Sequence, residues 1–278
     1  MEHNQLILSA KDVNIQFNLR GKVLHAIRGI DLDLYQGEVL AIVGESGSGK
    51  SVFTKSFMGL LDANGSITSG TIDYYGMADG KPLRLSDLRT EKDWLRVRGR
   101  EIAMVMQDPM TSLNPLKTIG DQILEAVTLH QGLKGTEARA RTLEYLRDVG
   151  ISDPEVRFKQ YPHEFSGGMR QRAALARTLY EDCPIVLMDE PFSALDTLTR
   201  TRIQTLAATL LAGRTVVLIT HDPQEACRLS HRLLVLSAAD GDIDDNHHLA
   251  GTPPRAPDAP DLLIGQAALL QQLMRAQP

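Results

Sequence analysis

The stretch EVLAIVGESGSGKS, residues 38–51, carries the clearest structural signal of the sequence. After the leading glutamate its first residues are continuously apolar, which is typical of a strand that is covered on both faces. A glycine-rich turn follows, and the next residues, VFTKSFMGLL, have a helical pattern. The turn matches the pattern G-x-x-x-x-G-K-[ST] in the strand–turn–helix context that this pattern requires. The stretch therefore predicts a phosphate-binding loop.

The residue types of this loop suit a triphosphate, which concentrates negative charge in a small volume. A glycine-rich turn directs backbone N–H groups inward, and the next helix adds its positive end. Lys50 would reach the β- and γ-phosphates, and the Ser51 hydroxyl would ligate Mg²⁺. A flexible turn that matches by accident is the alternative, and the flanking strand and helix argue against it. The residues expected to contact the nucleotide are Gly44, Glu45, Ser46, Gly47, Ser48, Gly49, Lys50, Ser51 and Val52.

Apolar strands alternate with helical patterns along most of the chain, which is typical of a mostly parallel α/β sheet. Buried strands are expected in EVLAIV, REIAMVMQ, PIVLMDE, RTVVLITH and RLLVLS. Residues 6–17 and 30–35 alternate apolar and polar side chains, which predicts half-buried antiparallel strands. Helical patterns predict an inserted helical subdomain at about 108–180. Residues 238–278 predict a solvated linker and an amphipathic tail helix at 262–274.

Composition excludes several classes of protein. The formal net charge of -5 provides no basic field for nucleic acid, so no nucleic-acid partner is expected. The two cysteines, Cys183 and Cys227, do not suggest a disulfide framework or a zinc site. The N-terminal stretch MEHNQLIL lacks the apolar region of a signal peptide, and no apolar run approaches the length of a membrane span. Work at a membrane would therefore require other chains to cross it.

Two adjacent carboxylates, Asp189 and Glu190, end the apolar strand of PIVLMDEPFSALD. A buried strand end needs a reason to carry them, because burying an unpaired charge is costly. Mg²⁺ gives a reason for Asp189, and Glu190 could accept a proton from the attacking water. The alternative is a solvated exit from the strand. The phosphate loop in the same chain favours the functional interpretation.

Two further strands end in polar residues, Gln107 after IAMVM and His221 after TVVLIT. In a parallel sheet the carboxyl ends of the strands face the ligand crevice. We expect His221 to hydrogen-bond the γ-phosphate, and Gln107 to bind Mg²⁺ or the attacking water. A lone glutamine or histidine is usually structural. The four strand ends Gly44, Gln107, Asp189 and His221 together favour a catalytic site that contains Lys50, Gln107, Glu190 and His221.

The segment HEFSGGMRQR, residues 163–172, contains a second helix start that suits an anion, formed by Ser166, Gly167 and Gly168. The phosphate loop already accounts for this chain's own nucleotide. Two chains that pair head to tail would explain the second start, because each would cap the γ-phosphate held by the other. The structural alternative is an N-cap serine with glycines for tight packing.

The ordered set GESGSGKS, MVMQDP, FSGGMRQR, VLMDEPFSALD and THD resembles the nucleotide-binding subunit of ABC transporters over nearly the whole chain. The resemblance implies a P-loop NTPase with a RecA-like core, an antiparallel β subdomain and an inserted helical subdomain. It places the ABC ATPase domain at 1–237. It also implies ATP and Mg²⁺ as cofactors and an ATP-sandwich dimer whose closure drives membrane subunits.

The resemblance also assigns roles to individual residues. Ser193 to Asp196 would contact the partner subunit. Phe17 is the candidate for stacking on adenine, with His25 as its rival. The common signature is LSGGQ, and this chain has Phe165 and Met169 at its ends, so it lacks the usual glutamine side chain while the backbone N–H groups remain.

The two halves of the chain resemble different importers. Up to about residue 172 the chain is similar to the oligopeptide, dipeptide and nickel group, and from about 185 to ATPases for thiamine precursors, nitrate or sulfonates. Because the ATPase contacts the membrane subunit through the first half, peptide import is favoured and thiamine-precursor import is the alternative. The implied partners are two permeases, a second ATPase subunit and, indirectly, an extracytoplasmic solute-binding protein. The implied location is the cytoplasmic face of the membrane.

Functions of another class remain as alternatives. ABC-type ATPases also act on ribosomes or in DNA repair, but those forms carry two cassettes or a long coiled coil, and this chain shows neither pattern. A nucleotide-binding switch without hydrolysis would not need Glu190 as a base.

Overall fold

The computed structural model describes residues 5–106, 113–179, 183–193, 195–236 and 243–275. Gln107 and Ala194 lie outside the described residues, so the predictions for them are not tested. Within the described ranges, no helix combines the length and the apolar character that crossing a bilayer requires.

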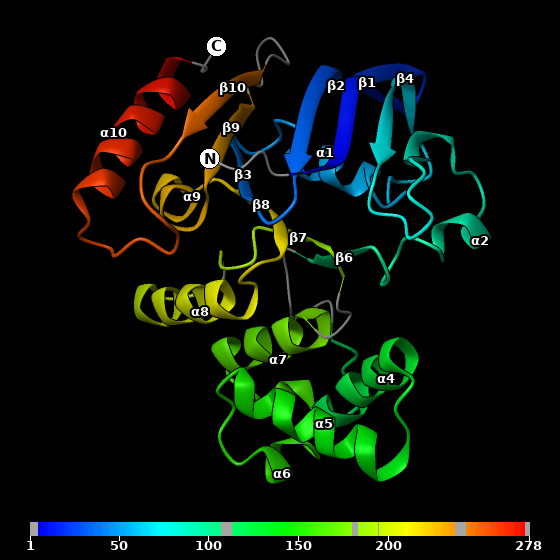
Figure 1. Ribbon diagram of the computed structural model, residues 1–278, viewed down its shortest axis with the longest axis vertical. Helices are drawn as coiled ribbons and strands as arrows, with labels where there is room; N and C mark the ends of the chain where they lie inside the picture. The colour runs from blue at the N-terminus through cyan, green and yellow to red at the C-terminus, as the bar shows by residue number, and fades with distance from the viewer. Residues whose placement is uncertain (1–4, 107–112, 180–182, 194, 237–242, 276–278) are drawn as a thin grey trace.

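The central sheet has six strands in the order β10-β9-β3-β8-β7-β6 (Figure 1). The five strands from β9 to β6 run parallel to one another, as predicted. The edge strand β10 pairs with β9 in the antiparallel direction. The strands are β3 (Val39–Gly44), β6 (Ile102–Val105), β7 (Ile185–Asp189), β8 (Thr215–Thr220), β9 (Arg232–Leu236) and β10 (Ile243–His248).

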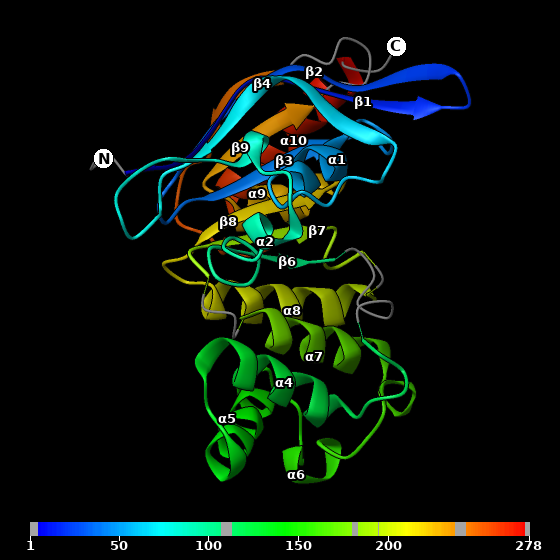
Figure 2. The ribbon, with the colours of Figure 1, turned by 90° about the vertical axis from the view of Figure 1, so that its right-hand side faces the viewer.

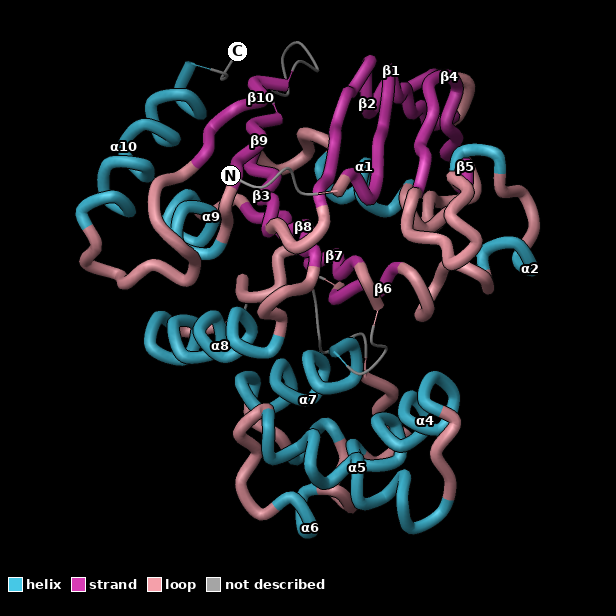
Figure 3. Tube along the Cα trace, viewed as in Figure 1, coloured by secondary structure: helices cyan, strands magenta, loops and turns pink. Residues whose placement is uncertain are grey.

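A second sheet is antiparallel, in the order β2-β1-β4-β5, and covers one face of the first (Figure 3). It confirms the antiparallel subdomain expected from the alternating patterns. Its strands are β1 (Leu6–Leu19), β2 (Lys22–Tyr35), β4 (Gly65–Tyr74) and β5 (Leu83–Arg84). The 3₁₀ turn η1 (Leu85–Asp87) and the short helix α2 (Glu91–Trp94) follow it.

Alternation along β3 explains the two layers of core. Leu40 and Ile42 face the cluster shared with the antiparallel sheet and with α1 (Lys50–Ser56). Ala41 and Val43 face a second cluster that is covered by helices. Those helices are α8 (Thr197–Leu210), α9 (Pro223–Leu229) and α10 (Pro260–Arg275).

The helical subdomain lies at one end of the molecule (Figure 2). It has its own buried cluster, which includes Ile123, Tyr145 and Phe165. Gly120 lies so close to Phe158 that a Cβ there would be 2.2 Å from the ring. Its described elements are α4 (Ile119–Gln131), α5 (Gly135–Asp148), α6 (Pro154–Arg157), η2 (Pro162–Glu164) and α7 (Gly167–Leu179).

The expected linker after residue 237 is wrong in part, because β10 lies within it and pairs with β9. Arg255, which is 6% exposed, then ties the following loop to α9 by donating to the carbonyls of Cys227 and Ser230, each at 2.8 Å. The amphipathic tail helix is present as α10, and Leu262 and Leu269 bury it against its own domain.

Candidate functional site

The phosphate loop joins β3 to α1, and backbone proximity explains two of its glycines. A Cβ at Gly44 would lie 2.5 Å from the Leu236 carbonyl oxygen, and one at Gly49 would lie 2.7 Å from the Ala26 carbonyl oxygen. Gly49 also has a φ of 93°, which side chains rarely adopt. The close approach of three chain segments therefore requires glycine at both positions.

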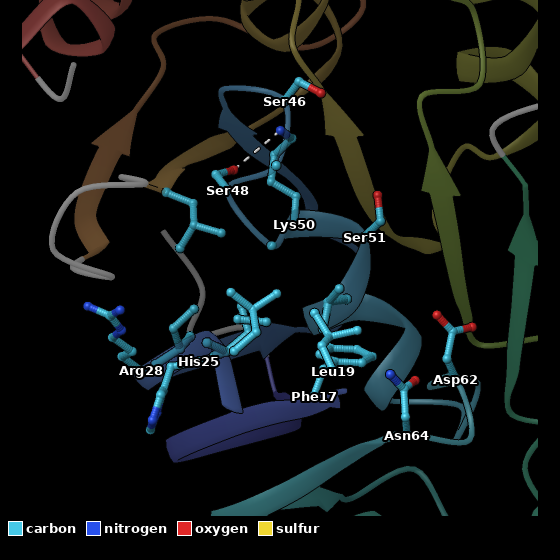
Figure 4. A pocket seen from close by; sticks show the side chains of 18 of the residues that line it. Phe17, Leu19, His25, Arg28, Ser46, Ser48, Lys50, Ser51, Asp62 and Asn64 are labelled. Atoms are coloured by element: carbon cyan, nitrogen blue, oxygen red, sulfur yellow. Dashed lines mark hydrogen bonds between the residues drawn. The ribbon is translucent and has the colours of Figure 1, made fainter. Parts of the chain in front are cut away.

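Lys50 is 4% exposed and lies under the loop. Its ammonium donates to the carbonyls of Gly44 (2.8 Å) and Glu45 (2.6 Å) and is 3.4 Å from the Ser48 Oγ (Figure 4). Burial lowers the pKa of Lys50, and the carboxylates of Glu190, Asp189 and Glu45 act in the opposite direction. The loop thus holds a buried cation among backbone groups, which suits a phosphate anion.

Ser51 and Asp189 meet beside the loop, although they are far apart in the sequence. The Ser51 hydroxyl donates to Asp189 Oδ1 at 2.7 Å. Asp189 is 2% exposed, and burial raises its pKa while the hydrogen bond from Ser51 lowers it. A hydroxyl and a buried carboxylate are the hard oxygen donors that Mg²⁺ prefers, so these two residues fit such an ion.

Glu190 and His221 lie side by side at the ends of β7 and β8. Glu190 Oε2 is 3.2 Å from His221 Nδ1, and the two side chains are 16% and 58% exposed. Glu190 has a φ of 44°, unusual for a residue with a side chain, and its N–H donates to the Ile219 carbonyl at 2.9 Å. Strained backbone at a polar strand end is frequent at functional sites.

A cleft of about 590 Å³ lies between this loop and the hairpin of β1 and β2. Both candidates for the adenine contact, Phe17 and His25, line it (Figure 4). Phe17 is 9% exposed and packs against Gly65, whereas His25 is exposed and its Nδ1 lies 3.1 Å from the Gln16 amide. Phe17 therefore forms a packed apolar part of the cleft surface, whereas His25 is a polar residue at its exposed edge.

Sequence reasoning missed several residues that line this cleft. They come from the hairpin of β1 and β2 and from the connection between α1 and β4, and no motif marks them. They are Leu19, Leu24, Arg28, Asp62 and Asn64.

The glycines of the second helix start differ from each other. A Cβ at Gly168 would lie 2.8 Å from Thr199 Cγ2, so packing against α8 explains this glycine. Among the described residues, a Cβ at Gly167 would meet nothing within 4 Å. Ser166 Oγ accepts from the Met169 N–H at 3.3 Å, as an N-cap does, and Met169 packs on the helical cluster. Packing against the described part of the chain therefore does not explain Gly167.

The structure brings the phosphate loop, Asp189, Glu190 and His221 together, but not Ser166 to Gly168. No residue of α7 is among those that line the cleft. The second helix start belongs to the helical subdomain, away from the chain's own loop (Figure 1).

Glu225 is a buried acid near this site that sequence reasoning did not identify. It is 4% exposed in α9, four residues after His221. Burial is the main cause that raises its pKa, to about 8, and the charge of Asp222 raises it further. The folded protein therefore keeps this carboxyl protonated at pH values where an exposed glutamate is ionised.

We expect Glu225 to make stability fall as the pH rises. Between the ordinary pKa of 4.5 and about 8, the unfolded state binds fewer protons than the folded state, so the free energy of unfolding decreases. Glu225→Gln removes this titration. The melting temperature of the variant minus that of the parent should therefore increase as the pH rises from about 5.5 to about 8.5. Parallel curves for the two proteins would contradict the assignment.

Comparisons with known proteins agree with this geometry. Residues 27–193 match the family model described as ABC transporter. The chain is 44% identical over 241 residues to the oligopeptide transport ATP-binding protein AmiE of Streptococcus pneumoniae, covering 86% of this chain and 66% of AmiE. It is 42% identical over 236 residues to the dipeptide transport ATP-binding protein DppD of Bacillus subtilis, covering 84% and 68%.

A solved structure has the same fold. It is the dimeric structure of a post-hydrolysis state of the ATP-binding cassette MJ0796 bound to ADP and Pi. The TM-score is 0.74 at 29% identity, covering 88% of this chain and 100% of that one. The fold is therefore the ABC ATPase fold, and the chain belongs to the ABC transporter family.

Proposed function

We propose that this chain is the ATP-binding and ATP-hydrolysing subunit of an importer for oligopeptides or dipeptides. The observation that carries the proposal is the cluster at the strand ends: a buried lysine under a phosphate loop, the Ser51–Asp189 pair, and Glu190 beside His221. A module that only binds nucleotide would not need the last pair.

The geometry supports a role for each of these residues. The loop from Gly44 to Val52 binds the phosphates, and Phe17 packs against the base. Ser51 and Asp189, with Gln107 from outside the described residues, would hold Mg²⁺, which would neutralise charge on the phosphate oxygens. Glu190 accepts the proton of the attacking water, and His221 orients Glu190 and donates to the γ-phosphate.

The second ATPase subunit completes the site in this proposal. The open space at Gly167 supports it, because an exposed helix start without side chains suits a phosphate from another chain. The solved relative is a dimer. Ser193 to Asp196 would contact the partner, and the described members Ser193 and Asp196 are both exposed.

Transport requires partners that this chain does not contain. We propose two permease subunits, a solute-binding protein that acts through them, and a peripheral position on the cytoplasmic face of the membrane. The names of the relatives favour peptides as cargo, and their alignments, over 241 and 236 residues, extend beyond the first half of the chain. This favours peptides over the thiamine-precursor alternative.

The test has two stages. The purified chain should hydrolyse ATP, and in vesicles with its permeases the rate should rise with a peptide-loaded binding protein. If neither the chain nor the complex hydrolysed ATP, the proposed ATPase activity would be refuted. If a thiamine precursor stimulated the rate and peptides did not, only the proposal of peptides as cargo would be refuted.

Gly167→Glu should separate nucleotide binding from dimer closure. The new carboxylate has room in the monomer, so the melting temperature should stay near that of the parent. It would face the partner's γ-phosphate, so we expect ATP-dependent dimerisation to be lost and hydrolysis to fall by about a hundredfold. Light scattering and phosphate release measure the two effects.

Val156→Glu is the matched control, because Val156 is 61% exposed in the same subdomain. It should leave both dimerisation and hydrolysis unchanged. Parent-like dimerisation of Gly167→Glu would refute a phosphate contact at this helix start.

A further inference from the structure

A second, small pocket lies directly beside Glu190 and His221, between the start of α8 and the turn from β8 to α9. Its volume is about 30 Å³, and the seven described residues that line it are all polar or charged. A single water needs on the order of 10–15 Å³ and two to four polar partners. The pocket has the size and the chemistry for one water molecule.

Two buried polar atoms in the lining residues have no hydrogen-bond partner among the described residues. They are Arg200 Nε and Glu225 Oε1. An unpaired buried polar group costs about 1–3 kcal/mol, so native structures normally satisfy such groups, often with water. Because a water molecule both donates and accepts hydrogen bonds, one water can satisfy the Arg200 N–H group and the carboxyl oxygen of Glu225, whether or not that oxygen carries the proton.

The remaining atoms of Arg200 join two loops of the candidate site. Nη2 donates to the Leu195 carbonyl at 3.0 Å, in the loop that follows Glu190. Nη1 donates to Asp222 Oδ2 at 3.3 Å, in the residue next to His221. Asp222 Oδ1 caps α9 by accepting from the Gln224 N–H at 2.9 Å. Each oxygen of Asp222 thus has a separate partner, which fixes this carboxylate.

Glu225 is held from the opposite side. Its Oε2 accepts from the Gln204 amide of α8 at 3.2 Å. The Gln204 oxygen in turn accepts from Arg228 of α9 at 2.6 Å. Glu225 thus has one oxygen paired with Gln204, and the Thr220 hydroxyl, which also lines the pocket, interacts with the same carboxyl group and lowers its pKa.

We propose that this pocket binds one ordered water, which bridges Arg200 Nε and Glu225 Oε1, and that Arg200 and Glu225 are positioning residues which hold His221 against Glu190. The inference rests on the proposed ATPase function and deepens it. Neither residue contacts the nucleotide. The water instead connects the loop after Glu190 to the turn that carries His221.

The link matters because it joins the two loops that carry Glu190 and His221. The side chains of this pair are 3.2 Å apart, and the N–H of Glu190 donates to the Ile219 carbonyl. Arg200 and the water add a further connection between the same two loops. Small displacements of a catalytic pair lower turnover strongly, whereas they change nucleotide binding little.

The variants Arg200→Met and Glu225→Leu each remove one partner of the water. We expect kcat to fall by about tenfold while KM for ATP stays within about twofold. Glu225→Gln keeps the shape and a polar end, so it should restore most of the parent kcat. Arg202→Met is the matched control: Arg202 is exposed on the same helix, and the variant should have the parent kcat.

A crystal structure of the parent protein that resolves waters tests the binding site without any variant. The expected result is a water within hydrogen-bond distance of both atoms, lost in Glu225→Leu. A dry pocket, or a water that contacts neither atom, would overturn the proposal. Parent-like kcat in both disruptive variants would overturn the positioning role, whereas a parent protein without hydrolysis would refute the proposed function instead.

Discussion

Glu190→Gln should nearly abolish ATP hydrolysis and leave a nucleotide-bound dimer. The amide has the size of the carboxylate and keeps a hydrogen-bonding group near His221 Nδ1, which lies 3.2 Å from Glu190 Oε2. The backbone bond to Ile219 does not involve the side chain. The amide cannot accept a proton, so we expect kcat to fall by about 10²–10⁴-fold.

Phosphate release at saturating ATP measures the rate, and light scattering with ATP measures the dimer. Glu137→Gln is a suitable control, because Glu137 is exposed on α5 in the helical subdomain. Glu190→Gln should be as stable as the parent protein, because the substitution leaves the backbone at residue 190 with its φ of 44°. Turnover at the parent rate would exclude Glu190 as the base.

The parts of the fold that could be predicted from the sequence have local signals. β3, β7 and β8 each contain a continuous apolar run, and the residues of these runs are buried or, at Val39, partly buried. The pattern of the phosphate loop fixes its strand and helix. Because parallel strands end at one edge, the meeting of Asp189 with Ser51 follows from these elements.

Other parts have no local signal. β10 has the sequence IDDNHH, which lacks an apolar face, and backbone pairing with β9 holds it in the sheet. The different roles of Gly167 and Gly168 depend on where Thr199 of α8 packs. Likewise, the sequence of α9 makes Glu225 look like an ordinary acid on a helix surface. In the structure it is buried and contacts Gln204 of α8. Long-range packing decides these features, and a single sequence does not reveal it.

Lys50→Ala should abolish nucleotide binding at micromolar concentrations, with a loss of affinity of about a hundredfold or more, and hydrolysis should be lost with it. The ammonium is the buried cation of the loop, held by the carbonyls of Gly44 and Glu45. Without it, less positive charge offsets the carboxylates of Glu190, Asp189 and Glu45, which all act electrostatically on the Lys50 position, so phosphates bind there less well.

A loss of stability must be separated from this loss of binding, because the substitution also leaves two carbonyls without their donor, at a cost of about 1–3 kcal/mol. Lys50→Met keeps most of the side-chain volume, so it should fold better than Lys50→Ala and bind ATP as poorly. Lys159→Ala, at an exposed position of the helical subdomain, should bind like the parent. Titration with a fluorescent ATP analogue and thermal melting compare all three. If Lys50→Met bound nucleotide as tightly as the parent, the phosphates would not depend on this charge, and the assignment of the loop would be wrong.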